Sequence, residues 1–193
     1  MVWQDCRFRS GCKSNDIVMT TSTNGTTWTA VSRIPIDTTG STVDHFIPGL
    51  AVDSTTSGST AKLALAYYYY PSRSCTASTC QLNVGYVSSA NGGTSWTAPT
   101  QLVGPMTLSW LPNTSQGRMV GDYISTSYAG GTAHPVFTNA VAPVGSVFNQ
   151  AMVTPSTGLA TAAGSFVVTS SGDHAIPNAA SDHAAPQAPI VTR

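Results

Sequence analysis

The feature that most constrains the fold is a short segment that occurs twice. Residues 22–30 read Ser-Thr-Asn-Gly-Thr-Thr-Trp-Thr-Ala, and residues 89–98 read Ser-Ala-Asn-Gly-Gly-Thr-Ser-Trp-Thr-Ala. The two tryptophans lie 68 residues apart, and each segment follows one strand-like run and precedes another. A unit that returns along a chain is typical of repeat architectures, in which each repeat is one supersecondary module.

The composition of the segment predicts a hairpin corner that its own side chains stabilise. Each copy contains Asn-Gly, at 24–25 and at 91–92, and both residue types tolerate the positive φ of a tight turn. The neighbouring Ser and Thr hydroxyls can bond to the amides of the turn. We expect Trp28 and Trp96 to fold back over the turns. The alternative is an ordinary β-turn beside an unrelated tryptophan, which the second copy disfavours.

These segments resemble the Asp-box (BNR) repeat of the sialidase superfamily, written Ser-x-Asp-x-Gly-x-Thr-Trp. An Asn takes the place of the Asp in both copies, and the first copy is one residue shorter. The matching positions are Asn24, Gly25, Thr27 and Trp28 in the first copy and Asn91, Gly93, Ser95 and Trp96 in the second.

Three other stretches are similar to the bacterial sialidase-like family. They are VWQD at 2–5, DHFIP at 44–48 and GRMVGDY at 117–123. The resemblance covers residues 1–155 and implies β-propeller blades around a central channel. It implies little about activity, because the Asp box is a structural corner that also occurs in propellers with other functions.

The spacing of strands and turns predicts an all-β chain. Runs such as 63–70 and 82–88 have β propensity or alternate in polarity, and Pro and Gly interrupt the chain at short intervals. We expect about three four-stranded antiparallel blades, half of the six-bladed ring that the resemblance implies.

The expected blades divide the chain into units. Residues 1–171 form the blades: a partial one at 1–40, a complete one at 41–105 and a third at 106–171. The third unit ends in a strand-like piece at 165–170. Residues 172–193 are rich in Ala and Pro, and we expect a mobile tail.

Charge and hydropathy exclude several partners. Only 8% of the residues are charged and the net charge is zero, so nothing attracts the chain to nucleic acid or to an anionic membrane. No run approaches the ~18 apolar residues of a membrane span. The chain begins in what reads as mid-strand sequence, so we expect a portion that precedes it in the parent protein.

The four cysteines form two local pairs, Cys6 with Cys12 and Cys75 with Cys80. In each unit the second cysteine lies 16 residues before the corner tryptophan, so the pairs belong to the repeat. We expect short disulfides, which imply an oxidising, extracellular location. The alternative is a four-cysteine zinc site, although the spacings are unusual for one.

Five residues are candidates for catalysis at the mouth of the channel. Asp44 and Asp122 precede the expected inner strands of the second and third units, and His45 follows Asp44. Arg118 lies four residues before Asp122, and His134 opens a neighbouring strand. The alternative is structural, because an Asp at a strand end often caps a loop and such a His is often a satisfied structural group.

The family's own mechanism does not fit this chain. The resemblance implies three arginines that hold a carboxylate, a Tyr nucleophile activated by a Glu, and an Asp as acid/base. All eight acidic residues here are Asp, so the activating Glu is missing. Arg118 is the one arginine near an expected inner strand. The Arg-Ile-Pro at 33–35 is similar to a family motif, but it follows an Asp box instead of preceding the first one.

Three function classes remain open. The first is a secreted glycan-directed hydrolase, or a remnant of one, with Asp44 or Asp122 as acid/base. The second is a non-catalytic carbohydrate-binding or interaction module, with Trp3, Trp110 and Tyr123 as stacking faces for sugars.

The third class is a metal-assisted hydrolase with Ca²⁺ or Zn²⁺ on Asp44, His45 and Asp122. Half a ring would also leave strand edges and apolar faces open. We therefore expect either a second copy that completes the ring or a longer parent chain.

Overall fold

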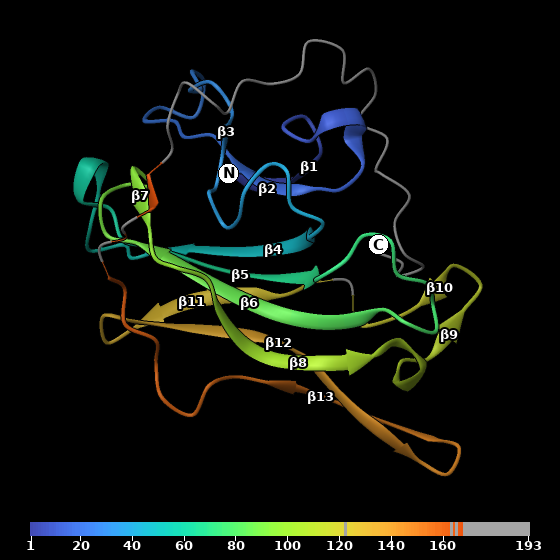
Figure 1. Ribbon diagram of the computed structural model, residues 1–193. Helices are drawn as coiled ribbons and strands as arrows, with labels where there is room; N and C mark the ends of the chain where they lie inside the picture. The colour runs from blue at the N-terminus through green and yellow to red at the C-terminus, as the bar shows by residue number, and fades with distance from the viewer. Residues whose placement is uncertain (122, 163, 165, 168–193) are drawn as a thin grey trace.

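The computed structural model describes residues 1–167 except 122, 163 and 165, and the fold is all-β as predicted. The regular elements of this part are strands and three short 3₁₀ turns. Three antiparallel sheets follow one another along the chain and lie side by side in space (Figure 1). Among the described residues these sheets do not close into a barrel or a ring.

The sheets have the following strands. The N-terminal sheet has the order β1 (Val2–Asp5), β2 (Asp16–Met19), β3 (Ser32–Arg33). The central sheet has the order β4 (Asp44–Val52), β5 (Leu63–Tyr70), β6 (Gln81–Ser89), β8 (Thr100–Thr107). The third sheet has the order β11 (Ser125–Ala129), β12 (Thr132–Val144), β13 (Val147–Val153).

Smaller elements connect these sheets. They are the pair β9 (Asn113–Thr114) and β10 (Gly117–Arg118), the pair β7 (Ser95–Trp96) and β14 (Phe166–Val167), and the turns η1 (Ser10–Cys12), η2 (Gly58–Thr60) and η3 (Leu108–Trp110).

The central sheet is covered on both faces. Alternate residues of β5 point to opposite faces, so Leu65 and Tyr67 join a core with the N-terminal sheet. Ala66 and Tyr68 join a second core with the third sheet. This explains why the Leu-Ala-Leu-Ala-Tyr-Tyr-Tyr-Tyr sequence of β5 is apolar or aromatic throughout and almost completely buried.

The first strand of the central sheet also contacts the third sheet. Thr126 Oγ1 donates a 2.8 Å hydrogen bond to the carbonyl oxygen of Gly49 in β4. A Cβ at Gly49 would lie 3.0 Å from the carbonyl oxygen of Ile124, so a larger residue would force β4 and this segment slightly apart. On the other side, the backbone N–H of Ile47 donates to Gln4 Oε1 at 3.0 Å. β4 therefore lies between β1 and β11.

The sheets differ in their number of described strands. The central sheet has four, and the N-terminal and third sheets have three each. Of the strand-like piece expected at 165–170, the structure describes residues 166 and 167. Its described part, β14, pairs with β7, opposite Ser95 and Trp96. The predicted tail at 172–193 lies outside the described residues.

Candidate functional site

The first corner has the hydrogen bonds that its sequence predicts. Ser22 Oγ accepts from the backbone N–H of Gly25 at 2.8 Å. Asn24 Oδ1 accepts from the backbone N–H of Thr27 at 2.8 Å. Gly25 has a φ of 74°, a conformation that favours glycine.

The second corner repeats this pattern. Ser89 Oγ accepts from the N–H of Gly93 at 2.9 Å, and Asn91 Oδ1 accepts from the N–H of Ser95 at 2.9 Å. Trp96 folds back so that its Nε1 donates to the carbonyl oxygen of Gly93 at 3.0 Å. The two segments are therefore the same structural motif.

The two corner tryptophans have different surroundings. Trp96 is completely buried in the core between the N-terminal and central sheets, whereas Trp28 is 43% exposed. The second corner sits against the N-terminal sheet, where a Cβ on Gly93 would lie 2.5 Å from Met19 Cε. Trp28 belongs to none of the buried cores of the described chain.

Both predicted disulfides are present, so the zinc alternative for the cysteines is wrong. Cys6 is bonded to Cys12 and Cys75 to Cys80, and the chain has no free cysteine. The first disulfide closes the loop that contains Arg9.

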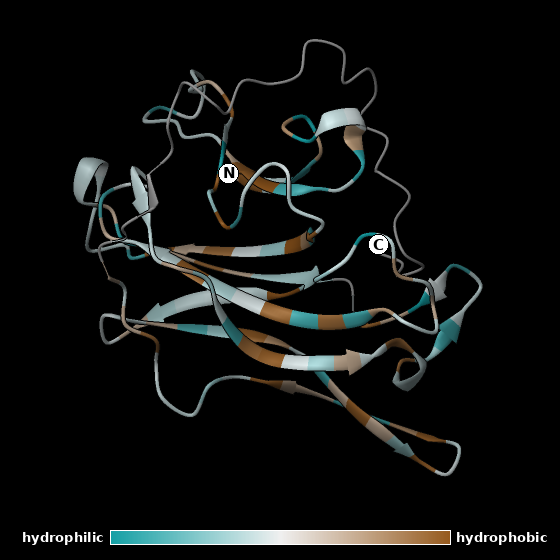
Figure 2. Cartoon of the chain, in the orientation of Figure 1, coloured by the Kyte–Doolittle hydropathy of each residue, from teal (hydrophilic) through white to brown (hydrophobic). Residues whose placement is uncertain are grey.

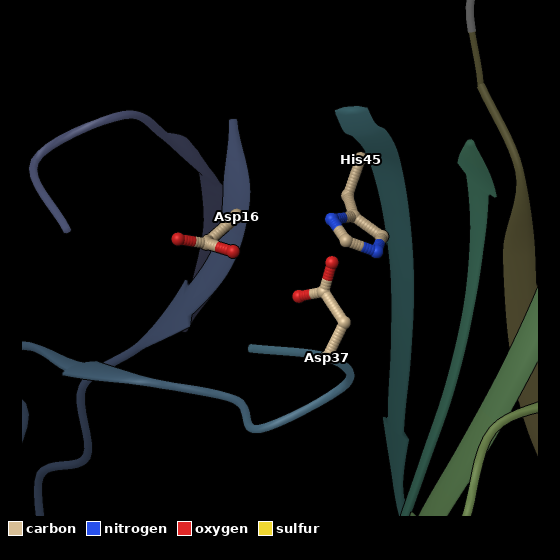
Figure 3. A group of neighbouring side chains, drawn as sticks. All are labelled: Asp16, Asp37 and His45. Carbon is tan, nitrogen blue, oxygen red and sulfur yellow. The ribbon is translucent and has the colours of Figure 1, made fainter. Parts of the chain in front are cut away.

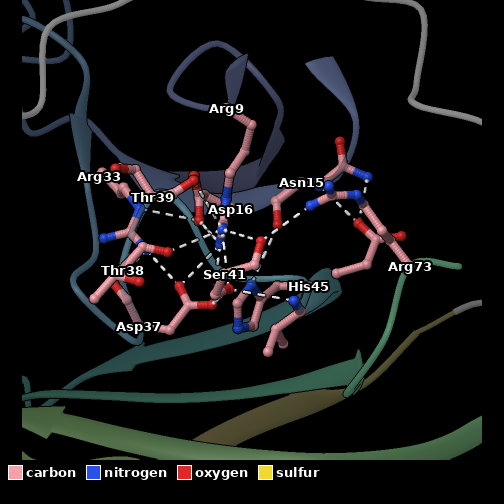
Figure 4. A network of polar contacts seen from close by, with 12 residues as sticks. Arg9, Asn15, Asp16, Arg33, Asp37, Thr38, Thr39, Ser41, His45 and Arg73 are labelled. Atoms are coloured by element: carbon pink, nitrogen blue, oxygen red, sulfur yellow. Dashed lines mark hydrogen bonds and ion pairs between the residues drawn. The ribbon is translucent and has the colours of Figure 1, made fainter. Parts of the chain in front are cut away.

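A buried network of charges joins this loop to two other segments (Figure 4). Arg9 Nη2 donates to Asp16 Oδ1 at 2.6 Å and to Asp37 Oδ1 at 2.8 Å. Arg33 Nε lies 3.0 Å from Asp16 Oδ1, and its Nη2 donates to Asp37 Oδ1. Two arginines thus alternate with two aspartates, and Arg9, Asp16 and Arg33 are almost fully buried.

Arg9 also fixes the segment that leads into β4. Its Nη1 donates to the carbonyl oxygens of Thr38 and Ser41 at 3.0 and 3.2 Å and to Ser41 Oγ at 3.0 Å. Arg73 Nη1 donates to the same Ser41 carbonyl at 3.1 Å. The two arginines therefore hold in place the segment around residues 38–41, which connects the N-terminal sheet to the central sheet.

Asp44 lies at the start of β4 and is bonded to the N-terminal sheet. Its Oδ1 accepts from the backbone N–H of Asn15 at 2.6 Å and from Asn15 Nδ2 at 3.2 Å. Burial raises the pKa of Asp44 above its ordinary value, and the bonds from Asn15 offset this only in part.

His45 is buried beside the same network. Its Nδ1 lies 3.2 Å from the carbonyl oxygen of Asn15, so Nδ1 carries the proton that this carbonyl accepts. The ring meets Tyr67 edge to face, with centroids 5.5 Å apart. Burial lowers the pKa of His45 and outweighs the nearby charges of Asp37 and Asp16. The imidazole is therefore neutral at pH 7.

Asp16, Asp37 and His45 have potential metal-ligand atoms within 4.8 Å of one another (Figure 3). The residues nevertheless fit an arginine better than a divalent cation. Arg9 Nη2 already bonds both carboxylates, and a cation there would face two guanidinium groups. Asp44, a predicted ligand, is not part of this group, and Asp122 lies outside the described residues. The geometry therefore gives no support for Ca²⁺ or Zn²⁺ here.

Two other predicted catalytic residues, Arg118 and His134, have hydrogen-bond partners in elements other than β4. Arg118 Nη1 donates to the carbonyl oxygen of Leu111 at 2.8 Å, within its own loop. His134 lies opposite Ser127 in the third sheet, with Nε2 3.1 Å from Thr132 Oγ1. The predicted site is thus divided between separate elements.

The three aromatic candidates for sugar binding have different surroundings. Trp3 Nε1 donates to Asp5 Oδ2 at 3.0 Å, and the Arg7 guanidinium lies 5.9 Å from the Trp3 ring centroid. Trp110 packs against the core between the central and third sheets. Tyr123 is 78% exposed, just before β11.

Sequence reasoning missed the network of Arg9, Asp16, Arg33 and Asp37. Arg33 was noticed only through its Arg-Ile-Pro context. A usable signal was the scarcity of charge, because in a chain with 8% charged residues these four fall within one 29-residue stretch.

Comparisons with protein-family models, curated proteins and solved structures found no match to the chain.

Proposed function

We propose that this chain is part of a secreted, sialidase-like β-propeller that binds glycans without cleaving them. Two features support the blade architecture. The Asn-Gly-Trp corners share one hydrogen-bond pattern, and the central sheet is sandwiched between its neighbours as a propeller blade is.

The first strands of successive sheets would then line the channel of the propeller. β4 and β11 fit this role, since Thr126 Oγ1 bonds the Gly49 carbonyl and links the two strands directly. Asp44 and Tyr123 would lie at the same end of the channel, because each is at or just before the start of its strand.

The observation that carries the non-catalytic proposal is the state of the carboxylates. Each Asp in the described part of the chain already has a partner. Asp5, Asp16 and Asp37 bond arginines, Asp44 bonds an asparagine, and Asp53 bonds a threonine. A glycosidase needs two carboxyl groups that are free to face the scissile bond, and the described aspartates offer no such pair.

The same end of the sheets presents an exposed aromatic residue, Tyr123. Tyr123 keeps most of its side chain in solvent, unlike Trp3 and Trp110. An aromatic ring with a polar end suits a sugar, since its face contacts C–H groups and its hydroxyl can bond a sugar hydroxyl. Tyr123 is therefore our candidate for the stacking residue.

Glycan-array binding combined with an activity assay tests this function. We expect binding to at least one glycan class, and we expect Tyr123→Ala to weaken it about tenfold, or about 1.4 kcal/mol. Trp28→Ala, which alters another exposed aromatic residue, should leave binding unchanged. Fluorogenic glycosides should remain intact. Unchanged binding by Tyr123→Ala would contradict the proposal, and so would turnover by the wild-type protein.

One observation favours a second candidate, the glycan-directed hydrolase. Burial raises the pKa of Asp44, as is usual for the general acid of a glycosidase. Asp122 would then be its partner carboxylate. Turnover of a fluorogenic glycoside that is lost in both Asp44→Asn and Asp122→Asn would establish this candidate.

Two findings are compatible with secretion. The disulfides Cys6–Cys12 and Cys75–Cys80 suit an oxidising compartment. No helix within the described residues is long and apolar enough to cross a membrane.

A further inference from the structure

β13 forms the outer edge of the third sheet. It pairs with β12 along one side, and no other described strand pairs with its second side. Five of its seven residues are exposed and the other two are half-buried. The strand lies at the outside of the sheet stack in Figure 1. Within the described part of the chain, its outer row of backbone N–H and C=O groups therefore has no strand partner and can accept another strand.

This edge has little of the usual protection against pairing, because its pairing with β12 has one irregularity, between Val141 and Val144, and is regular over residues 149–153. Natural edge strands carry charges, prolines or bulges that prevent the addition of another chain. β13 has no charged residue, no proline and no glycine, and residues 123–172 contain no Asp, Glu, Lys or Arg. Its apolar side chains are exposed, with Phe148 at 45% and Met152 at 58%. Figure 2 colours parts of this strand brown, for hydrophobic residues.

We propose that β13 is the contact by which a second copy of this chain binds, through antiparallel pairing of β13 with β13. Seven residues give a pairing of about 24 Å at about 3.4 Å per residue. A two-fold axis through Gln150 places Gln150 opposite its own copy. Phe148 then lies opposite Met152 of the partner, and Val147 opposite the partner's Val153.

The side chains favour a second copy as the occupant. In a two-fold contact each residue meets the same surface on the other chain, so a charged edge would repel itself and this uncharged edge does not. The Gln150-centred register forms the Phe148–Met152 pair twice, and sulfur–aromatic contacts of this kind are favourable. The interface does not depend on the proposed glycan binding, because Tyr123 lies outside β13.

A single introduced cysteine tests both the contact and its register. The native cysteines are all in disulfides, so Gln150→Cys adds the one free thiol. Cross-strand neighbours have Cβ atoms about 4.5–5.5 Å apart, near enough for a disulfide after a small adjustment. Gln150→Cys should therefore form a covalent dimer under mild oxidation. Val52→Cys, at an exposed site on the central sheet, measures the rate of random collision.

Charged substitutions test the same contact without a disulfide cross-link. Light scattering should find the wild-type chain at twice 20.0 kDa, and Met152→Lys or Phe148→Lys should return it to a monomer. Val52→Lys is the control and should stay dimeric. The double change Phe148→Glu with Met152→Lys should restore the dimer, because the register places opposite charges across the two strands.

Three results would overturn the proposal. The first is a wild-type monomer at ~100 µM, a concentration high enough to reveal a contact of ~10 µM dissociation constant. The second is a dimer that persists in Met152→Lys and Phe148→Lys. The third is hydrogen-exchange protection, in a monomer, of those β13 amides that point away from β12, which would mean that another part of the same chain covers the edge.

Discussion

The corner tryptophans give the sharpest test of how the sheets pack. Trp28 and Trp96 occupy the same position of one motif, yet Trp96 is fully buried and Trp28 is 43% exposed. Trp96→Ala removes a complete indole from the core and the bond to the Gly93 carbonyl. Replacing a buried Trp by Ala costs about 3–5 kcal/mol, of which a neutral hydrogen bond contributes about 1 kcal/mol.

Trp28→Ala is the matched control. Nearly half of this side chain already contacts water. Its removal therefore loses less hydrophobic free energy of burial, and no closed cavity forms. We expect a loss of about 1–2 kcal/mol. Urea unfolding followed by far-UV circular dichroism measures both free energies of unfolding. Equal losses for the two variants would refute the reasoning, because the two tryptophans would then have equivalent surroundings.

Three other changes test the interior. Arg9→Met should cost about 3–5 kcal/mol, because it leaves two carboxylates to share the single charge of Arg33 in a buried network, whereas Arg7→Met, at a partly exposed ion pair, should cost about 1 kcal/mol or less; chemical denaturation measures both. Gly85→Ala should cost about 1–3 kcal/mol, because the new Cβ would lie 2.4 Å from Tyr67 Cζ; a calorimetric melting temperature equal to that of the wild type would contradict this. Burial lowers the pKa of His45, so the unfolded chain binds a proton that the folded chain does not. Stability should therefore fall as the pH drops below about 6.5, by up to about 1.4 kcal/mol per pH unit, and His45→Gln should reduce this slope in urea titrations at pH 7 and pH 5.

Local patterns predicted local structure well. The Asn-Gly corners and the two disulfides depend on residues close in sequence, and both formed as expected. The apolar run of β5 predicted a strand, although the sequence did not show that both of its faces are covered.

Contacts between distant residues could not be predicted. Arg9 meets Asp37 across 28 residues, and no motif spacing indicates that contact. The predicted catalytic set also depends on contacts between residues that are distant in sequence. Asp44 and His45 lie at the start of β4. His134 is paired with Ser127 in the third sheet, and Arg118 donates a hydrogen bond to the Leu111 carbonyl in its own loop.

The most direct test of the account is a crystal structure of this chain with the glycan that binds best on the array. We expect the intact sugar to stack on Tyr123, at the end where β4 and β11 begin, with Arg9 still bonded to Asp16 and Asp37. A sugar bound on another face would contradict the account, and so would a cleaved product beside Asp44.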